Sequence, residues 1–426
     1  MTAAKPFWTV VVAALLVACT SPAPLSQKDN LAYIYGKGGA QMPVQARIHH
    51  ISSDRSRIYY QLNTADLLYK SDGAGGAFHA SVRIRYEAYD RSDAKVPVDS
   101  ASIVLDDVRT GPSGEMDLIG SMDLRLGHQR AYLLKLVAHD LNRDLQSTVF
   151  LRVKGGDGLN AQHYMPVDTS HGLPYFTDHF KGGKVRVRCE ACTGKQITVQ
   201  RHPARTALPA PVFASGNSPD PALLAPADPP FPVQVDADGN FMLDLSVPGA
   251  YRIHSDTAAA PDIALYSISE AYPIVTTADD LLKPLRYITS NQEYERIQRS
   301  GDVRQAIEQF WIDAAGDRER GREAIRIYYG RVENANRHFT SETEGWRTDR
   351  GLVHIIFGVP TSIYRTDVGE TWIYGEENNL MSLVFNFQRR DGATDENDLV
   401  LERDPVLKGA WYRNVESWRN GRVYQN

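Results

Sequence analysis

Alternating apolar and polar positions dominate residues 31–155. The clearest run is 78–89, where every second residue from Phe78 to Ala88 is apolar and those between are polar. Period-two alternation with one polar side is typical of a half-buried antiparallel strand. Similar runs lie at 56–63, 100–107, 115–126, 132–138 and 147–153. The pattern predicts a β-sandwich of immunoglobulin-like or fibronectin-like architecture.

Residues 156–278 are predicted to form a second β domain. Alternation at 185–189 and 195–200 predicts one hairpin, and alternation on both sides of Asp238-Gly239, a strong turn signal, predicts another at 231–245. The stretch 203–232 between them holds nine prolines, which cannot continue a sheet ladder. We expect an extended surface loop within this domain, with docking of a proline-binding partner as the alternative.

From residue 279 to 426 the apolar period changes to three and four. Ser290 and Glu293 form a capping box, and apolar stripes at 303–311 and 324–339 predict two further helices. Short apolar runs at 352–358, 370–375, 381–388 and 398–402 predict strands after them. The predicted fold class is therefore multidomain, with two β-sandwich-like domains followed by an α+β C-terminal domain.

The first residues have the pattern of a secretory signal peptide. Lys5 precedes an apolar run at 7–18, which is too short to span a bilayer. Leu-Val-Ala directly before Cys19 resembles the lipobox of bacterial lipoproteins. That resemblance implies removal of residues 1–18, acylation of Cys19 and a lipidated tether at 19–30, with Thr20 favouring the outer membrane. An ordinary signal peptide with unmodified Cys19 is the alternative.

Net charge and cysteine content limit the kinds of binding partner and cysteine chemistry to be expected. The net charge of −5 argues against nucleic-acid binding, which usually shows a basic face. Besides Cys19, the cysteines are Cys189 and Cys192, and an exported compartment favours a disulfide between them. Structural zinc would need two more ligands, and a thioredoxin-type site expects a helix after the motif, so zinc and redox chemistry are the lesser alternatives.

A seven-residue signature lies between the predicted helices and strands. It consists of Gly345, Trp346, Arg347, Thr348, Asp349, Arg350 and Gly351. With its flanks at 328–339 and 353–360, it resembles the GWxTD domain of bacterial lipoproteins, over roughly residues 280–426. The resemblance implies an envelope lipoprotein and brings no established reaction.

Each residue of the signature has a structural interpretation. Gly345 permits a sharp exit from the helix, Gly351 allows close approach as the next strand begins, and Trp346 fills the gap between helices and sheet. Thr348 and Asp349 accept backbone N–H bonds. Arg350 is expected to pair with Asp349 or Glu333. In the alternative, Trp346, Arg347, Asp349 and Arg350 form a surface binding patch, since Trp and Arg are favoured at interface hot spots.

Nothing in the sequence indicates catalysis. It has neither GxSxG nor HExxH, and His338 and His354 near the signature are weak candidates for a metal site. We therefore expect no catalytic residue, no metal and no cofactor. The expected function is a membrane-anchored scaffold subunit of an outer-membrane assembly for secretion or surface display, with other envelope proteins as partners. The alternatives are a surface glycan- or ligand-binding lipoprotein, with Trp372, Trp411 or Trp418 stacked in a cleft, and a hydrolase.

Overall fold

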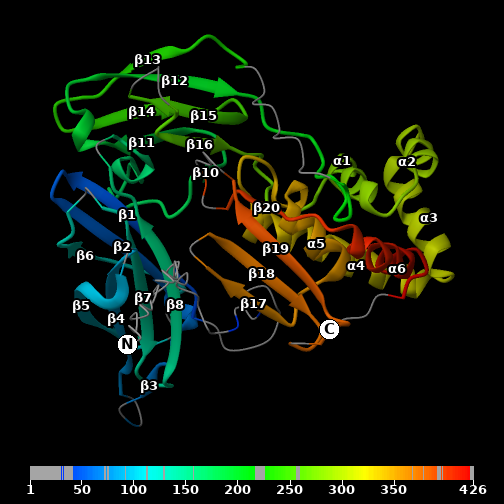
Figure 1. The fold of residues 1–426 in the computed structure, drawn as a ribbon, viewed down its shortest axis with the longest axis horizontal. Coiled ribbons are helices and arrows are strands. Elements are labelled where there is room, and N and C mark those ends of the chain that lie inside the picture. The colour runs from blue at the N-terminus through cyan, green and yellow to red at the C-terminus, as the bar shows by residue number, and fades with distance from the viewer. Residues whose placement is uncertain are drawn as a thin grey trace, which may run out of the picture.

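Three large hydrophobic cores organise the part of the chain that the computed structural model describes. Figure 1 shows the β-sheets and helices that surround them. The structure describes residues 30, 32 and 42–422, except 72, 74–75, 92, 112–113, 128–129, 157, 216–225, 256–259, 367, 378, 391–394 and 396. The first two cores lie between β-sheets and the third lies among helices and a sheet. The expected class, two β domains followed by an α+β domain, is confirmed. Cys19 and the predicted signal peptide lie outside the described residues.

The N-terminal sandwich packs a three-stranded sheet, ordered β1-β2-β6, against a sheet ordered β3-β4-β7-β8 with β5 paired to β4. Its strands are β1 (Val44–Ser52), β2 (Arg55–Asn63), β3 (Lys70–Ser71), β4 (Phe78–Asp90), β5 (Asp93–Arg109), β6 (Asp117–Leu124), β7 (Tyr132–Asp140) and β8 (Leu145–Val153). The predicted alternation in β4 is confirmed from Ala80 to Ala88, whereas Phe78 is exposed.

The second sandwich joins sheets ordered β10-β16-β15-β12-β13 and β14-β11-β9. Its strands are β9 (Met165–Val167), β10 (His179–Phe180), β11 (Lys184–Arg188), β12 (Gln196–His202), β13 (Phe231–Gln234), β14 (Asn240–Asp244), β15 (Gly249–His254) and β16 (Ile263–Ser267). Both predicted hairpins are wrong. β11 pairs with β14, and β12 pairs with β13, so each tight turn carries the chain from one sheet to the other. The turns suit a hairpin, but burial of both inner faces decides the pairing.

The C-terminal domain packs helices on a sheet ordered β17-β18-β19-β20. Its elements are α1 (Ala278–Leu282), α2 (Asn291–Gln298), α3 (Val303–Ala315), α4 (Arg318–Phe339), α5 (Asp349–Phe357), β17 (Ser362–Arg365), β18 (Gly369–Tyr374), β19 (Leu383–Arg389), β20 (Leu399–Leu401) and α6 (Lys408–Arg419). The predicted capping box at Ser290 and Glu293 begins α2.

One predicted strand of this domain is a helix. Residues 352–358 fall mostly within α5, which begins at an N-cap formed by Thr348. All nine residues of α5 are buried, so its apolar residues show no one-sided stripe. A short continuous apolar run does not distinguish a buried strand from a buried helix.

Two outlying segments pack against the C-terminal domain. Within the proline-rich stretch, Val212 is fully buried in the C-terminal core, and Asp404 donates its backbone N–H to the Val212 carbonyl at 3.1 Å. The stretch is therefore not simply a surface loop of the second β domain. Asn30 binds β17: its amide donates to the Thr361 carbonyl at 2.7 Å and its side-chain oxygen accepts from Ile363 at 2.9 Å.

Candidate functional site

The signature forms the turn between α4 and α5. Gly345 begins a 3-10 turn that ends at Arg347, and the Thr348 hydroxyl then accepts from the Gly351 N–H at 3.0 Å to cap α5. A Cβ at Gly345 would overlap the carbonyl oxygen of Ala335, and one at Gly351 would overlap that of Gly345. Close backbone approach therefore requires glycine at both positions, although the sequence indicates it only at Gly351.

Trp346 and Arg347 tie the turn to its surroundings. The Trp346 indole N–H and the Arg347 Nε both donate to a carboxylate oxygen of Glu344, at 3.0 and 2.7 Å. The Arg347 guanidinium lies 4.2 Å from the centre of the Trp346 ring and donates to the Thr206 carbonyl at 2.5 Å. Arg347 therefore fastens the proline-rich stretch to the C-terminal domain.

Asp349 acts as a second fastening point. Its carboxylate accepts from the Leu401 N–H at 2.8 Å and from the Arg403 guanidinium at 2.5 Å. Burial raises the pKa of Asp349, and the charge of Arg403 opposes that rise. Arg403 also donates to the Ala210 carbonyl at 3.2 Å, so this ion pair connects α5, β20 and the proline-rich stretch.

Arg350 enters the domain interior, where its side chain is 2% exposed. It pairs with Glu370 at 3.3 Å, rather than with Asp349 or Glu333 as expected, and donates to the Asn397 carbonyl at 2.8 Å. Glu370 also accepts from Arg365 at 2.7 Å and from the Trp372 indole at 3.0 Å. Burial alone would raise the pKa of Glu370, but Arg365 and Arg350 outweigh it and lower that pKa to about 2.

All seven signature residues are buried. Their polar side chains contact the Pro-rich stretch, β18 and β20 inside the molecule, which agrees with the structural interpretation. A surface patch built from Trp346, Arg347, Asp349 and Arg350 does not fit this burial. The tryptophans suggested for glycan stacking, Trp372, Trp411 and Trp418, are buried as well.

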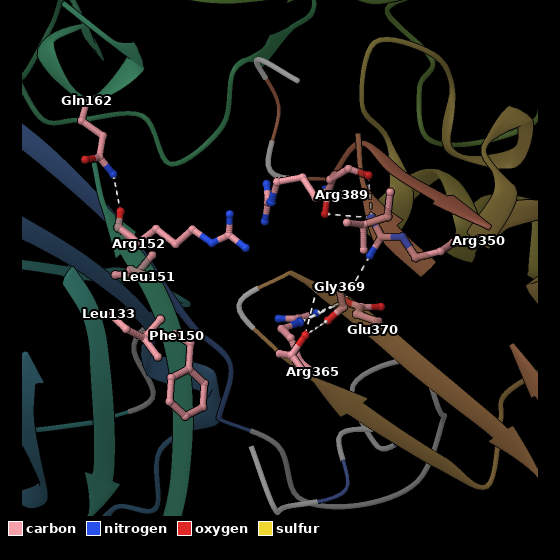
Figure 2. A pocket seen from close by; sticks show the side chains of 13 residues that line it. Leu133, Phe150, Leu151, Arg152, Gln162, Arg350, Arg365, Gly369, Glu370 and Arg389 are labelled. Carbon is pink, nitrogen blue, oxygen red and sulfur yellow. Dashed lines mark hydrogen bonds and ion pairs between the residues drawn. The ribbon is translucent and has the colours of Figure 1, made fainter. Parts of the chain in front are cut away.

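A cavity opens beside the buried Arg350–Glu370 pair, between the N-terminal sandwich and the C-terminal sheet (Figure 2). Its volume is about 190 Å³. Arg152 enters from β8, and Arg350, Arg365 and Arg389 enter from the C-terminal domain. Figure 2 shows the guanidinium groups of Arg152 and Arg389 pointing toward one another across the space.

No pattern in the sequence points to these cavity residues. Arg152, Arg365 and Arg389 come from strands that are distant in sequence, and no spacing links them. Gln162 holds the end of β8 in place, because its amide donates to the Arg152 carbonyl at 2.5 Å and accepts from the Lys154 N–H at 2.8 Å. Only Arg350 lies within a recognisable motif.

The remaining candidates lie elsewhere. Cys189 and Cys192 form a disulfide, with Cα atoms 5.3 Å apart, in the turn between β11 and β12. Within the described ranges, no three His, Cys, Asp or Glu side chains are placed to hold a metal ion. His354 is fully buried in α5, and burial lowers its pKa to about 3.

In the part of the chain that the structure describes, no helix is both long and apolar enough to cross a bilayer.

The fold and the buried turn define a multidomain, β-rich protein whose C-terminal α+β domain is organised around a tryptophan–arginine signature. Residues 249–420 match the model of the GWxTD domain family, so the chain is a GWxTD domain-containing protein. The match begins at β15, in the second sandwich, about thirty residues earlier than the resemblance in the sequence indicated.

The other comparisons add little. A search of curated proteins finds none that matches. Among solved structures, a calcium-binding mutant of Bacteroides uniformis beta-glucuronidase 2 shares 9% identity, with a TM-score of 0.16. That likeness covers 31% of this chain and 17% of the other, and it bears on neither fold nor function.

Proposed function

We propose that this chain is an exported, lipid-anchored envelope protein that serves as a non-catalytic subunit of an outer-membrane assembly and binds a neighbouring protein along β5. The observation that carries the proposal is the exposure of β5. Five apolar side chains of this one strand are exposed: Val96, Val98, Ile103, Val104 and Val108. Grouped exposed apolar residues are typical of protein interaction sites.

The edge of β5 is suited to strand addition. Among the described residues β5 pairs with β4 alone, which leaves its other edge without a strand partner. Between Ser100 and Arg109 the register with β4 is regular. A free edge of this length offers unpaired backbone groups to an added strand, and alternate side chains give specificity. Asp106 beside these apolar residues favours a partner strand with a basic residue opposite it.

The buried signature supports a non-catalytic role. Arg347, Asp349 and Arg350 hold the Pro-rich stretch, β20 and β18 through internal ion pairs and hydrogen bonds. Glu370, the acid nearest Arg350 in the cavity, is engaged by two arginines and an indole. The polar side chains of the motif are therefore used in internal contacts that hold the domain together.

The anchor rests on the lipobox-like residues 16–19. Acylation by several chains holds a protein on a bilayer stably. Ten residues lie between Cys19 and Asn30, and the eleven steps of a fully extended chain between them reach about 40 Å. Because Asn30 is bound to β17, an acylated Cys19 would keep the C-terminal sheet close to the membrane. Figure 1 shows β5 on the opposite side of the molecule from the C-terminal helices.

The anchor is tested by fractionation of cells that express the full chain. Cys19→Ser should move the protein from the membrane pellet to the soluble fraction, whereas Thr20→Ala should leave it in the pellet. Mass spectrometry of the mature N-terminus should find acyl chains on Cys19 in the unchanged protein. An unmodified cysteine there would overturn lipid anchoring.

The partner is tested by site-specific photocrosslinking in intact cells. A crosslinking residue at Val104 should capture one discrete envelope protein. The same residue at Leu380, a fully exposed apolar position on the β18–β19 loop, should not capture it. Equal capture at both positions, or none at Val104, would count against docking along β5.

A further inference from the structure

The loop between β18 and β19 exposes two adjacent apolar side chains. Leu380 is fully exposed and Met381 is 86% exposed, so these are the two most exposed large apolar side chains among the described residues. Val384, near the start of β19, is also exposed. Apolar residues scattered singly over a surface are ordinary, whereas grouped ones that are this open to water indicate a contact with another molecule or with a membrane.

Hydrogen bonds hold this loop in a defined shape. The Ser382 N–H donates to the Asn379 carbonyl at 3.0 Å, and the Met381 N–H donates to the side-chain oxygen of Asn379 at 2.9 Å. The Ser382 hydroxyl donates to the Glu376 carbonyl at 2.7 Å. These bonds satisfy polar groups within the loop and leave the side chains of Leu380 and Met381 in solvent.

The N-terminal segment reaches the same loop. The Asn30 amide donates to the Ser362 hydroxyl at 3.4 Å, and that hydroxyl donates to the Glu377 carboxylate at 2.9 Å. Asn30 is therefore two hydrogen bonds away from the β18–β19 loop, although Asn30 and Ser362 are 332 positions apart in the sequence. Because an extended chain from Cys19 to Asn30 reaches at most about 40 Å, an acylated Cys19 would keep this loop near the bilayer surface.

We propose that Leu380 and Met381 enter the lipid bilayer and give the protein a second contact with the membrane beside the acylated Cys19. This contact rests on the proposed lipid anchor, which makes insertion of the loop an intramolecular event, so two side chains suffice. Transfer of their apolar surface from water to hydrocarbon is favourable. Two points of attachment would fix the orientation of the C-terminal domain on the bilayer, which one anchored residue does not.

The acidic residues of the loop limit how deep it enters. Glu376 and Glu377 precede the apolar pair, and charged carboxylates stay out of hydrocarbon. Only the tip with Leu380 and Met381 therefore enters, while the two carboxylates remain at the level of the headgroups. Two acids beside the tip also oppose attraction to anionic lipids, so apolar burial drives the contact.

The test uses the acylated full chain, purified and reconstituted in vesicles of phosphatidylethanolamine and phosphatidylglycerol. Leu380→Cys is labelled with an environment-sensitive fluorophore, to which Cys189 and Cys192 do not react because they form a disulfide. The emission should shift to the blue on reconstitution and should be lost when the lipid acyl chains carry nitroxide groups. The matched control is Met242→Cys, at an exposed apolar position of β14 in the second sandwich, which should show neither change. Equal quenching at both positions, or none at Leu380, would overturn the membrane contact.

A second substitution distinguishes insertion from proximity to the bilayer. Met381→Asp, added to the labelled Leu380→Cys chain, places a carboxylate at the tip of the loop, so quenching by the nitroxide lipids should fall. Met242→Asp should leave the quenching at Leu380 unchanged. Both positions are exposed, so both variants should fold normally. Equal quenching with and without Met381→Asp would mean that the loop lies near the bilayer without entering it, and would overturn the proposal.

Mass spectrometry of the same preparation separates failure of the loop contact from failure of the anchor. An acylated Cys19 without quenching at Leu380 overturns the loop contact and leaves the anchor standing. An unmodified Cys19 overturns the anchor and, with it, the loop contact that depends on it.

Discussion

Helix α5 and strand β5 are both rich in apolar residues, yet they have opposite surroundings. All nine residues of α5 are buried, including the charged Asp349 and Arg350. In β5 no described side chain is buried, and Ile103 and Val104 are 40% and 43% exposed although they point to opposite faces. The segment with a recognisable signature is thus enclosed, and the segment without one is open to solvent.

The different burial of α5 and β5 indicates that α5 stabilises the fold, whereas β5 is available for recognition of a partner. Around α5, charge is balanced internally by Glu370 and Arg403, so a substitution there should act on the stability of the C-terminal domain. Among the described apolar side chains of β5, only Leu105 packs against the sandwich core. A substitution at its other apolar positions should act on association with partners.

Removing the buried cation of α5 should be the most damaging change. Arg350→Met leaves Glu370 buried with Arg365 as its remaining cation, and breaking a buried ion pair costs about 3–5 kcal/mol. The measurement is urea unfolding followed by tryptophan fluorescence. Of the six tryptophans, the five outside the predicted signal peptide are Trp311, Trp346, Trp372, Trp411 and Trp418, all within the C-terminal domain, so the signal reports that domain.

A double variant provides the control. Arg350→Met combined with Glu370→Gln removes the uncompensated charge as well, and should recover part of the lost free energy of unfolding. If the double variant is as unstable as the sum of the single variants, the two side chains do not interact energetically, and the role assigned to α5 would be wrong.

The same pair should make the domain sensitive to acid. The folded-state pKa of Glu370 is about 2, below its ordinary value of 4.5, so its charge stabilises the fold above pH 4.5. That stabilisation, about 3 kcal/mol, should be lost as the pH falls from 4.5 to 2, because the unfolded chain takes up the proton first. Urea midpoints at pH 6 and 3 measure the loss, and Glu370→Gln should show a smaller difference between the two.

Close packing of the signature should give an intermediate effect. Gly351→Ala places a Cβ against the Gly345 carbonyl, and we expect a loss of about 1–3 kcal/mol, although alanine favours a helix. The matched control is Gly330→Ala in α4, where a Cβ meets nothing within 4 Å. That variant should gain about 0.5–1 kcal/mol. Equal effects of the two substitutions would show that the close approach at Gly351 has no energetic weight.

The sequence predicts those features that local pattern controls. Alternation located β4 and β7, the capping box located α2, and Gly351 indicated close approach. Features set by long-range packing were not predictable. Packing on the faces of residues 352–358 decides that they form a helix and not a strand. Packing on the faces of β11 likewise decides that it pairs with β14. The arginine cavity joins Arg152 of β8 to Arg365 and Arg389, which lie more than 200 residues further along the chain, so neither spacing nor periodicity could indicate it.

The smallest effect on stability is expected in β5. Val104→Lys replaces a side chain that is 43% exposed and lies outside the sandwich core, so the free energy of unfolding should change by no more than about 0.5 kcal/mol. A lysine on a free strand edge nevertheless opposes addition of an apolar strand. Loss of the crosslinked partner without loss of stability would therefore show that β5 serves recognition and that α5 serves stability.

The exposed polar neighbour offers the control, because Ser102→Lys adds the same charge without removing an apolar contact. If both lysines abolish capture equally, charge rather than the apolar surface of β5 governs the association.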